Sequence, residues 1–141
     1  MTDLSALSIE LIEKGWKLVK DVDPVLPWIG GDVEYVFFLQ DGERFISGDE
    51  LRERAAVLGA NYGQRDAEWL VKHQEMLSEC PEEVRYILFP GTLWEHPNGA
   101  FLSPYLYRTG AEVEWGVYVF WLDFGFSARV RLVRPAQEVS S

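Results

Sequence analysis

The feature that most constrains the fold is the apolar run Val117–Leu122, because it has no polar face. Just before it, Glu112 and Glu114 alternate with apolar residues, as in a strand that has one face in water. Successive side chains of a strand point to opposite faces, so this run needs cover on both sides. Helices, a strongly curved sheet, a partner chain or a ligand could supply that cover. The amphipathic segments in residues 48–80 could cover one face of the run. We therefore expect its odd-numbered residues to lie in the core.

Three earlier segments have the spacing of amphipathic helices. They span about residues 3–14, about 47–59 and about 65–79. Thr2 or Asp3 can cap the first helix, and Gly15 is placed to end it in a left-handed conformation. Ser47 and Glu50 have the spacing of a capping box at the start of the second.

Extended segments dominate the second half of the chain, where the hydrophobic period changes to two. They span about residues 86–89, 92–95, 100–107, 112–122 and 128–133. Earlier, the runs 33–40 and 43–46 flank Asp41-Gly42, which predicts a two-residue hairpin. Pro104 cannot donate to a ladder, so it predicts a sheet edge or a bulge at that point.

The order of these elements predicts an α+β fold, because strands and helices are segregated along the chain. We expect a curved antiparallel sheet of about five to seven strands, mostly a C-terminal meander, with two or three helices packed on one face. A chain of 141 residues suits one domain. We therefore assign residues 1–135 to a single α+β domain and residues 136–141 to a loose C-terminal tail.

The charge of the chain disfavours two classes of partner. The formal net charge is −10, and such a chain repels phosphate backbones and anionic lipids. We therefore expect no nucleic acid and no membrane as partners.

Cys80 is the one cysteine, so we expect no internal disulfide and a buried thiol. With no segment typical of a signal peptide or a membrane span, we expect a cytoplasmic location.

The even-numbered face of the aromatic strand is the first candidate site. Tyr118 and Phe120 lie on this face, and Tyr105 and Tyr107 share a face of the preceding extended segment. A concave sheet lined by such rings would hold a small apolar or planar ligand.

Arg129 and Arg131 share one face of the last extended segment, which gives them two interpretations. In the first interpretation, they lie on a solvated outer face and pair with Glu112 or Glu114 across a hairpin. Alternatively, they present a fork to the carboxylate or phosphate group of the ligand.

A second candidate region is the predicted hairpin tip that contains Trp94 and His96. Glu95 beside His96 would allow general acid–base chemistry, but neighbours in an extended chain point to opposite faces. Asp123 begins the triplet Asp-Phe-Gly, which we interpret as a turn because the rest of the kinase signature is absent. We predict no catalytic residues, no metal site and no cofactor.

The sequence favours a non-enzymatic, cytoplasmic protein-interaction module of an acidic inhibitor, immunity or regulatory type. The acidic helical half and the surplus of aromatic side chains support this hypothesis. Its partner would be another protein, of basic charge, and a homodimer through the aromatic sheet is an alternative. The competing hypothesis is a small-molecule-binding protein that uses the aromatic face and the arginine pair. An enzyme is third, with His96, Glu95 and Asp123 as candidates.

Overall fold

The computed structural model describes residues 5–24, 33–78, 80–109, 114–122, 125–127 and 129–135. The helices are α1 (Ala6–Glu13), α2 (Gly48–Val57), α3 (Gln64–Lys72) and the 3-10 helix η1 (Gln74–Leu77). The strands are β1 (Lys17–Lys20), β2 (Val33–Val36), β3 (Phe45–Ile46), β4 (Tyr86–Leu88), β5 (Leu93–Glu95), β6 (Phe101–Thr109), β7 (Glu114–Trp121), β8 (Phe126–Ser127) and β9 (Val130–Pro135).

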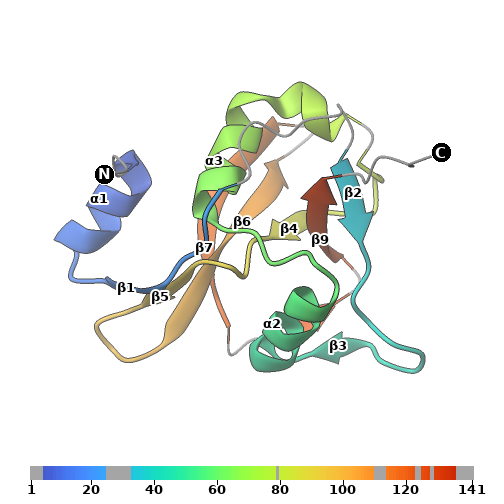
Figure 1. The fold of residues 1–141 in the computed structure, drawn as a ribbon, viewed down its shortest axis with the longest axis horizontal. Coiled ribbons are helices and arrows are strands. Elements are labelled where there is room, and N and C mark those ends of the chain that lie inside the picture. The colour runs from blue at the N-terminus through green and yellow to red at the C-terminus, as the bar shows by residue number, and fades with distance from the viewer. Residues whose placement is uncertain are drawn as a thin grey trace.

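The main sheet is mostly antiparallel and curls into a half-barrel (Figure 1). Its strands follow the order β1-β5-β6-β4-β9-β2, and β7 pairs with β6 outside this path. The long strand β6 therefore has β7 on one side, and β5 and then β4 on the other. The predicted α+β class with a curved sheet is confirmed.

The last strand does not continue the meander. β9 lies between β4 and β2, parallel to β4 and antiparallel to β2 (Figure 1). Tyr86 is paired with Val130, and Tyr35 with Val133. The sheet is therefore mixed, because the period of two identifies strands without specifying their neighbours.

The predicted hairpin at Asp41-Gly42 is wrong. The turn itself exists, since Gly42 has a φ of +84° and the Glu43 N–H donates to the Gln40 carbonyl at 3.0 Å. The flanking strands then diverge, because β2 pairs with β9 and β3 pairs with β8. β2 ends at Val36, so no ladder reaches the turn.

Pro104 lies inside the sheet, which corrects the predicted edge. Its carbonyl accepts the Phe89 N–H at 2.9 Å, and the nitrogen of the same residue points to the same side of the strand. On that side β6 changes neighbour, from β5 at Leu102 to β4 at Tyr105. The N–H that Pro104 lacks would point to the position where β6 changes from one neighbour to the other, so the ladder does not need this donor.

The N-terminal helix begins later than its sequence suggests. Ser5 caps α1, and its Oγ accepts the Ser8 N–H at 3.1 Å. Thr2 and Asp3, the predicted caps, lie outside the described residues. Gly15 follows the helix with a φ of +88°, as its position predicts.

The other two helices show one confirmed signal and one correction. The Ser47 Oγ accepts the Glu50 N–H at 3.2 Å, as a capping box requires, while the Glu50 carboxylate accepts from Arg54 Nε instead of closing the box. The predicted helix 65–79 is broken at His73, where φ is −131° and ψ is 54°. The chain then continues as η1.

Helices α3 and α2 contribute to two hydrophobic clusters on opposite faces of the sheet. Leu70 of α3 packs in the first cluster with Ile87, and Leu51 of α2 packs in the second with Leu88. Ile87 and Leu88 are consecutive in β4, so they point to opposite faces. In Figure 1, α3 crosses the sheet beside β6 and β7, whereas α2 lies near β3.

The apolar run is partly covered within one chain. Val117 and Phe120 are half-buried and pack against the first and second clusters, respectively, and Leu122 is buried in the second. Cover on the second face is incomplete, since Tyr118 keeps 43% of its surface exposed. The candidate site lies on this incompletely covered face.

The predicted turn at Asp123 and the predicted C-terminal tail 136–141 fall on residues that the structure does not describe. Within the described part of the chain, none of the helices is long and apolar enough to cross a membrane.

Candidate functional site

The second face of the sheet carries a group of neighbouring aromatic rings, which we call the ring cluster. It consists of Tyr86, Tyr105, Tyr107, Tyr118, Phe120 and Phe126. The Tyr105 ring is central, with its centroid 5.8 Å from Tyr86, 5.7 Å from Tyr118 and 5.4 Å from Phe120. These separations are typical of favourable aromatic pairs.

Strand register brings the rings together. Tyr105 in β6 is opposite Leu88 in β4 and Tyr118 in β7, and Tyr107 is opposite Tyr86. Side chains alternate along β6, so Tyr105 and Tyr107 project away from the face that packs against α3. Phe126 comes from β8, outside the main sheet, and closes the group beside Phe120 at 5.8 Å.

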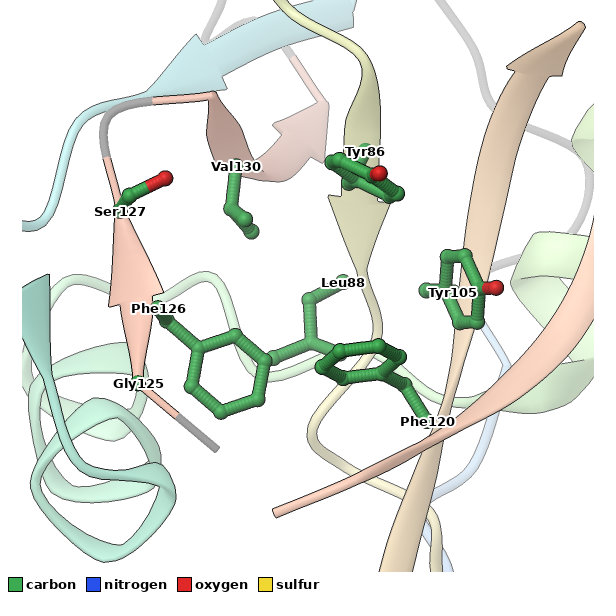
Figure 2. Close-up of a pocket in the computed structure, with 8 residues that line it drawn as sticks. All are labelled: Tyr86, Leu88, Tyr105, Phe120, Gly125, Phe126, Ser127 and Val130. Atoms are coloured by element: carbon green, nitrogen blue, oxygen red, sulfur yellow. The ribbon is translucent and has the colours of Figure 1, made fainter. Parts of the chain in front are cut away.

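A cavity of about 130 Å³ opens beside this cluster. It is lined by Tyr86, Leu88, Tyr105, Phe120, Gly125, Phe126, Ser127 and Val130. Figure 2 shows the four lining rings and the side chains of Leu88 and Val130 arranged around it. An apolar protein cavity of about 150 Å³ is large enough for one benzene molecule. The cavity therefore matches a single ring or a compact apolar group.

The walls of this cavity present ring faces at steep angles. The planes of Tyr105 and Phe120 meet at 76°, and those of Phe120 and Phe126 at 70°. The polar groups of the lining are the hydroxyls of Tyr86, Tyr105 and Ser127 (Figure 2). Burial raises the pKa of Tyr105, so its phenol stays neutral near neutral pH. The lining offers apolar contact and neutral hydrogen bonds.

The structure brings four of the predicted site residues together. Tyr105 and Phe120 line the cavity, and Tyr107 and Tyr118 belong to the same ring cluster. Sequence reasoning missed the other lining residues, chiefly Tyr86, Leu88, Phe126 and Val130. Alternation places Tyr86 and Leu88 on one face of β4, but it does not show that this face adjoins Tyr105.

The arginine pair is not part of the cavity. Arg131 alternates in β9 with Val130 and Leu132, which pack in the second cluster, so it points to the opposite face. There its guanidinium lies over the Phe37 ring, 4.6 Å from the centroid. Arg129 is exposed and, like Arg131, is absent from the lining. The structure thus separates the two arginines from the aromatic site.

The predicted pairing of these arginines with Glu114 across a hairpin is also wrong. β7 pairs with β6 and β9 pairs with β4 and β2, so the two strands are not neighbours. Glu112 lies outside the described residues.

Trp94 is a core residue rather than a surface contact. It is fully buried, and its Nε1 donates to Oε1 of the buried Gln64 at 2.8 Å. Gln64 Nε2 in turn donates to Ser8 Oγ at 2.8 Å. Trp94 therefore connects β5 to α3 and α1.

His96 does lie at a hairpin tip, but it is packed between two aromatic rings. Its ring centroid is 4.9 Å from that of Trp16 and 5.3 Å from that of Trp121. Its Nδ1 accepts the Asn98 N–H at 3.1 Å, which ties the ring to its own turn. These contacts account for His96 structurally, away from the aromatic cavity.

Cys80 is buried, as expected for a small apolar side chain. Burial raises the pKa of its thiol, which keeps the thiol protonated near neutral pH. Among the described residues, no group of three or more His, Cys, Asp or Glu side chains could hold a metal ion.

Comparisons with known proteins give no relative from which a function could be transferred. No protein-family model matches the chain, and no curated protein or solved structure shows a significant match. Its function therefore has to be argued from the site itself.

Proposed function

We propose that this protein binds a small ligand by enclosing one aromatic ring, or a compact apolar group of that size, in the ring-lined cavity. The observation that carries the proposal is the cavity of about 130 Å³, whose walls are four rings and two aliphatic side chains. Concave, mostly apolar pockets with a few polar groups are the usual form of small-molecule sites.

The chemistry of the lining supports binding without catalysis. Among the described residues, the eight that line the cavity include no His, Cys, Asp, Glu, Lys or Arg. The Ser127 hydroxyl accepts the Arg129 N–H at 3.4 Å, and burial keeps the Tyr105 phenol neutral. Hydroxyls in this state orient a ligand through hydrogen bonds, and the rings supply apolar contact.

The first measurement is native mass spectrometry of gently purified protein. A retained small mass would show that a ligand is bound and would restrict its composition. Thermal unfolding in the presence of benzene or phenol gives the second readout, because a ligand that binds only the folded state raises the unfolding temperature. No shift with either probe, together with a bare chain mass, would refute the proposal.

A pair of variants tests the location of the site. Ser127→Leu places an isobutyl group at the cavity wall and is expected to abolish the ligand-dependent shift. Tyr107→Phe is the matched control, since Tyr107 belongs to the ring cluster without lining the cavity. A shift that survives Ser127→Leu unchanged would place binding elsewhere.

Binding of another protein is the second candidate function. Exposed apolar side chains on α1 and on β1, the first strand of the sheet order, favour it. Ile9 and Ile12 are each 45% exposed, and Leu18 and Val19 are 42% and 48% exposed. Side chains of this kind are common anchors of protein interfaces when they lie together.

This candidate predicts specific losses. Ile9→Asp combined with Ile12→Asp is expected to abolish capture of a partner, whereas Val57→Asp, on the 88%-exposed Val57 of α2, is expected to preserve it. An association rate that falls with rising salt would indicate steering of a basic partner by the acidic chain. Equal capture by both variants would refute an interface on α1.

A further inference from the structure

A second hollow, of about 490 Å³, adjoins the first hydrophobic cluster, on the other face of the sheet from the ring-lined cavity. Its lining includes Leu77 and Trp115, which are apolar, and Arg108, which carries the one basic side chain of the lining. We call it the Arg108 hollow. Neither hydrophobic periodicity nor a motif singles out this arginine in the sequence.

Arg108 is buried with few of its hydrogen-bond donors used. The residue is 6% exposed, and its Nη2 donates to the Cys80 carbonyl at 3.4 Å. Its Nε is buried without a hydrogen-bond partner. A guanidinium has five N–H donors, and a buried charge is costly unless it is paired and hydrogen-bonded. The arrangement leaves capacity for a further acceptor.

Two other partly buried arginines, Arg54 and Arg134, have acidic partners. Arg54 Nη1 lies 2.5 Å from Glu43 Oε1, and Arg134 Nη2 lies 2.7 Å from Glu34 Oε1. Among the described residues, no carboxylate oxygen lies within 4.0 Å of the Arg108 guanidinium nitrogens. Of Arg54, Arg134 and Arg108, Arg108 is thus the most buried, and it has no carboxylate partner among the described residues.

The guanidinium is held in a fixed place. Its Cζ lies 4.7 Å from the centroid of the Trp115 ring, a cation–π contact. Trp115 is fixed in turn by Gln74, whose Nε2 donates to the Trp115 carbonyl at 3.1 Å and whose Oε1 accepts the Trp115 N–H at 3.0 Å. A donor group held in advance loses little freedom when a ligand binds.

We propose that the Arg108 hollow binds a small organic monocarboxylate. The carboxylate would meet the guanidinium fork, whose planar donors match two carboxylate oxygens. The apolar body of the ligand would contact Trp115 and Leu77. The exposed Glu75 and Glu82 at the same hollow, and the net charge of −10, oppose any anion, and they oppose a doubly charged phosphate more strongly than a monocarboxylate.

Isothermal titration with butyrate and with its neutral counterpart butyramide, at constant ionic strength, tests this inference. Butyrate is expected to bind saturably and butyramide about tenfold or more weakly, because the charge-assisted pair is lost. The Gln74 side-chain amide, followed by NMR, is expected to shift with butyrate. Equal binding of the two compounds, binding of neither, or tighter binding of inorganic phosphate would each overturn the proposal.

Variants of Arg108 test whether this side chain binds the carboxylate. Arg108→Met is expected to abolish butyrate binding, and Arg108→Lys, which keeps the charge without the fork, to weaken it about tenfold. If Arg108→Met fails to fold, the affinity of Arg108→Lys for butyrate decides whether Arg108 binds the anion. Arg129→Met is the control, because Arg129 is exposed and does not line the hollow. Loss of binding in Arg129→Met with retention in Arg108→Lys would overturn the assignment.

Discussion

A single buried amide, Gln64, joins three parts of the fold. It is 3% exposed and accepts the Trp94 indole N–H, while its own backbone N–H donates to Thr92 Oγ1 at 2.7 Å. Gln64→Leu would keep the volume but leave the Trp94 donor unsatisfied in the core. We expect a loss of about 1–3 kcal/mol in the free energy of unfolding, measured by urea denaturation.

A double-mutant cycle separates the hydrogen bond from packing. Trp94→Phe removes the donor, so adding Gln64→Leu to it should cost less than Gln64→Leu costs alone. Strictly additive effects would show that the indole hydrogen bond contributes nothing to stability.

Gly48 permits the start of α2 to approach the end of β7. A Cβ at this position would meet the carbonyl oxygen of Leu122 and lie 2.8 Å from the Leu122 Cβ. Gly48→Ala is therefore expected to lower the free energy of unfolding by about 1–3 kcal/mol, through overpacking. Gly42→Asn is the control, since nothing lies within 4 Å of a Cβ there and Asn tolerates a positive φ. A neutral Gly48→Ala would contradict the close approach.

At the scale of elements, an ion pair ties the turn before β3 to α2. Both oxygens of Glu43 accept from Arg54, at 2.5 Å and 2.8 Å, and Glu43 Oε1 also accepts the Gln40 N–H at 2.6 Å. The Arg54 hydrogen bonds, followed by that of Gln40, lower the pKa of Glu43 from 4.5 to about 2. Arg54 Nη1 also donates to the Phe38 carbonyl at 3.0 Å.

The lowered pKa predicts a loss of stability in acid. A carboxyl with a depressed folded pKa stabilises the fold above its unfolded value of 4.5, and this contribution disappears as the pH falls towards about 2. Urea midpoints are expected to fall more for the wild type than for Glu43→Gln between neutral pH and about pH 3. Parallel curves for the two proteins would show that the pair adds no stability.

Local signals in the sequence predicted the ends of elements better than their neighbours. The Ser47 cap and the left-handed Gly15 depend on a few adjacent residues, and both are confirmed. Alternation grouped Tyr105 with Tyr107 and Tyr118 with Phe120, and these rings lie in one cluster. The Asp41-Gly42 hairpin failed because the partners of the flanking strands are chosen by distant segments.

At the scale of the whole molecule, the lining residues that the sequence did not predict have the same explanation. Tyr86 and Val130 line the cavity because β4 and β9 pair in parallel, and no local pattern specifies that pairing. Trp94 was named as a candidate binding residue, but it is buried beside Gln64, which lies 30 residues away in the sequence. Burial in a sheet of this kind is decided by contacts that periodicity does not encode.

The net charge of the chain gives a prediction for the molecule as a whole. A net charge of −10 opposes the compact state by self-repulsion. Raising sodium chloride from about 0.01 to about 0.15 M shortens the Debye length from about 30 to about 8 Å and should raise the urea midpoint. A midpoint that falls with salt would show that attractive ion pairs outweigh the repulsion.

The position of β9 bears on how the chain acquires its structure during synthesis. This strand is the last of the described chain, yet it lies between β4 and β2. Until it leaves the ribosome, β2 lacks its neighbour in the sheet and β4 keeps one edge unpaired, beside apolar side chains of both clusters. Exposed edges of this kind promote aggregation and recruit chaperones. The nascent chain therefore needs protection until β9 emerges and completes the sheet.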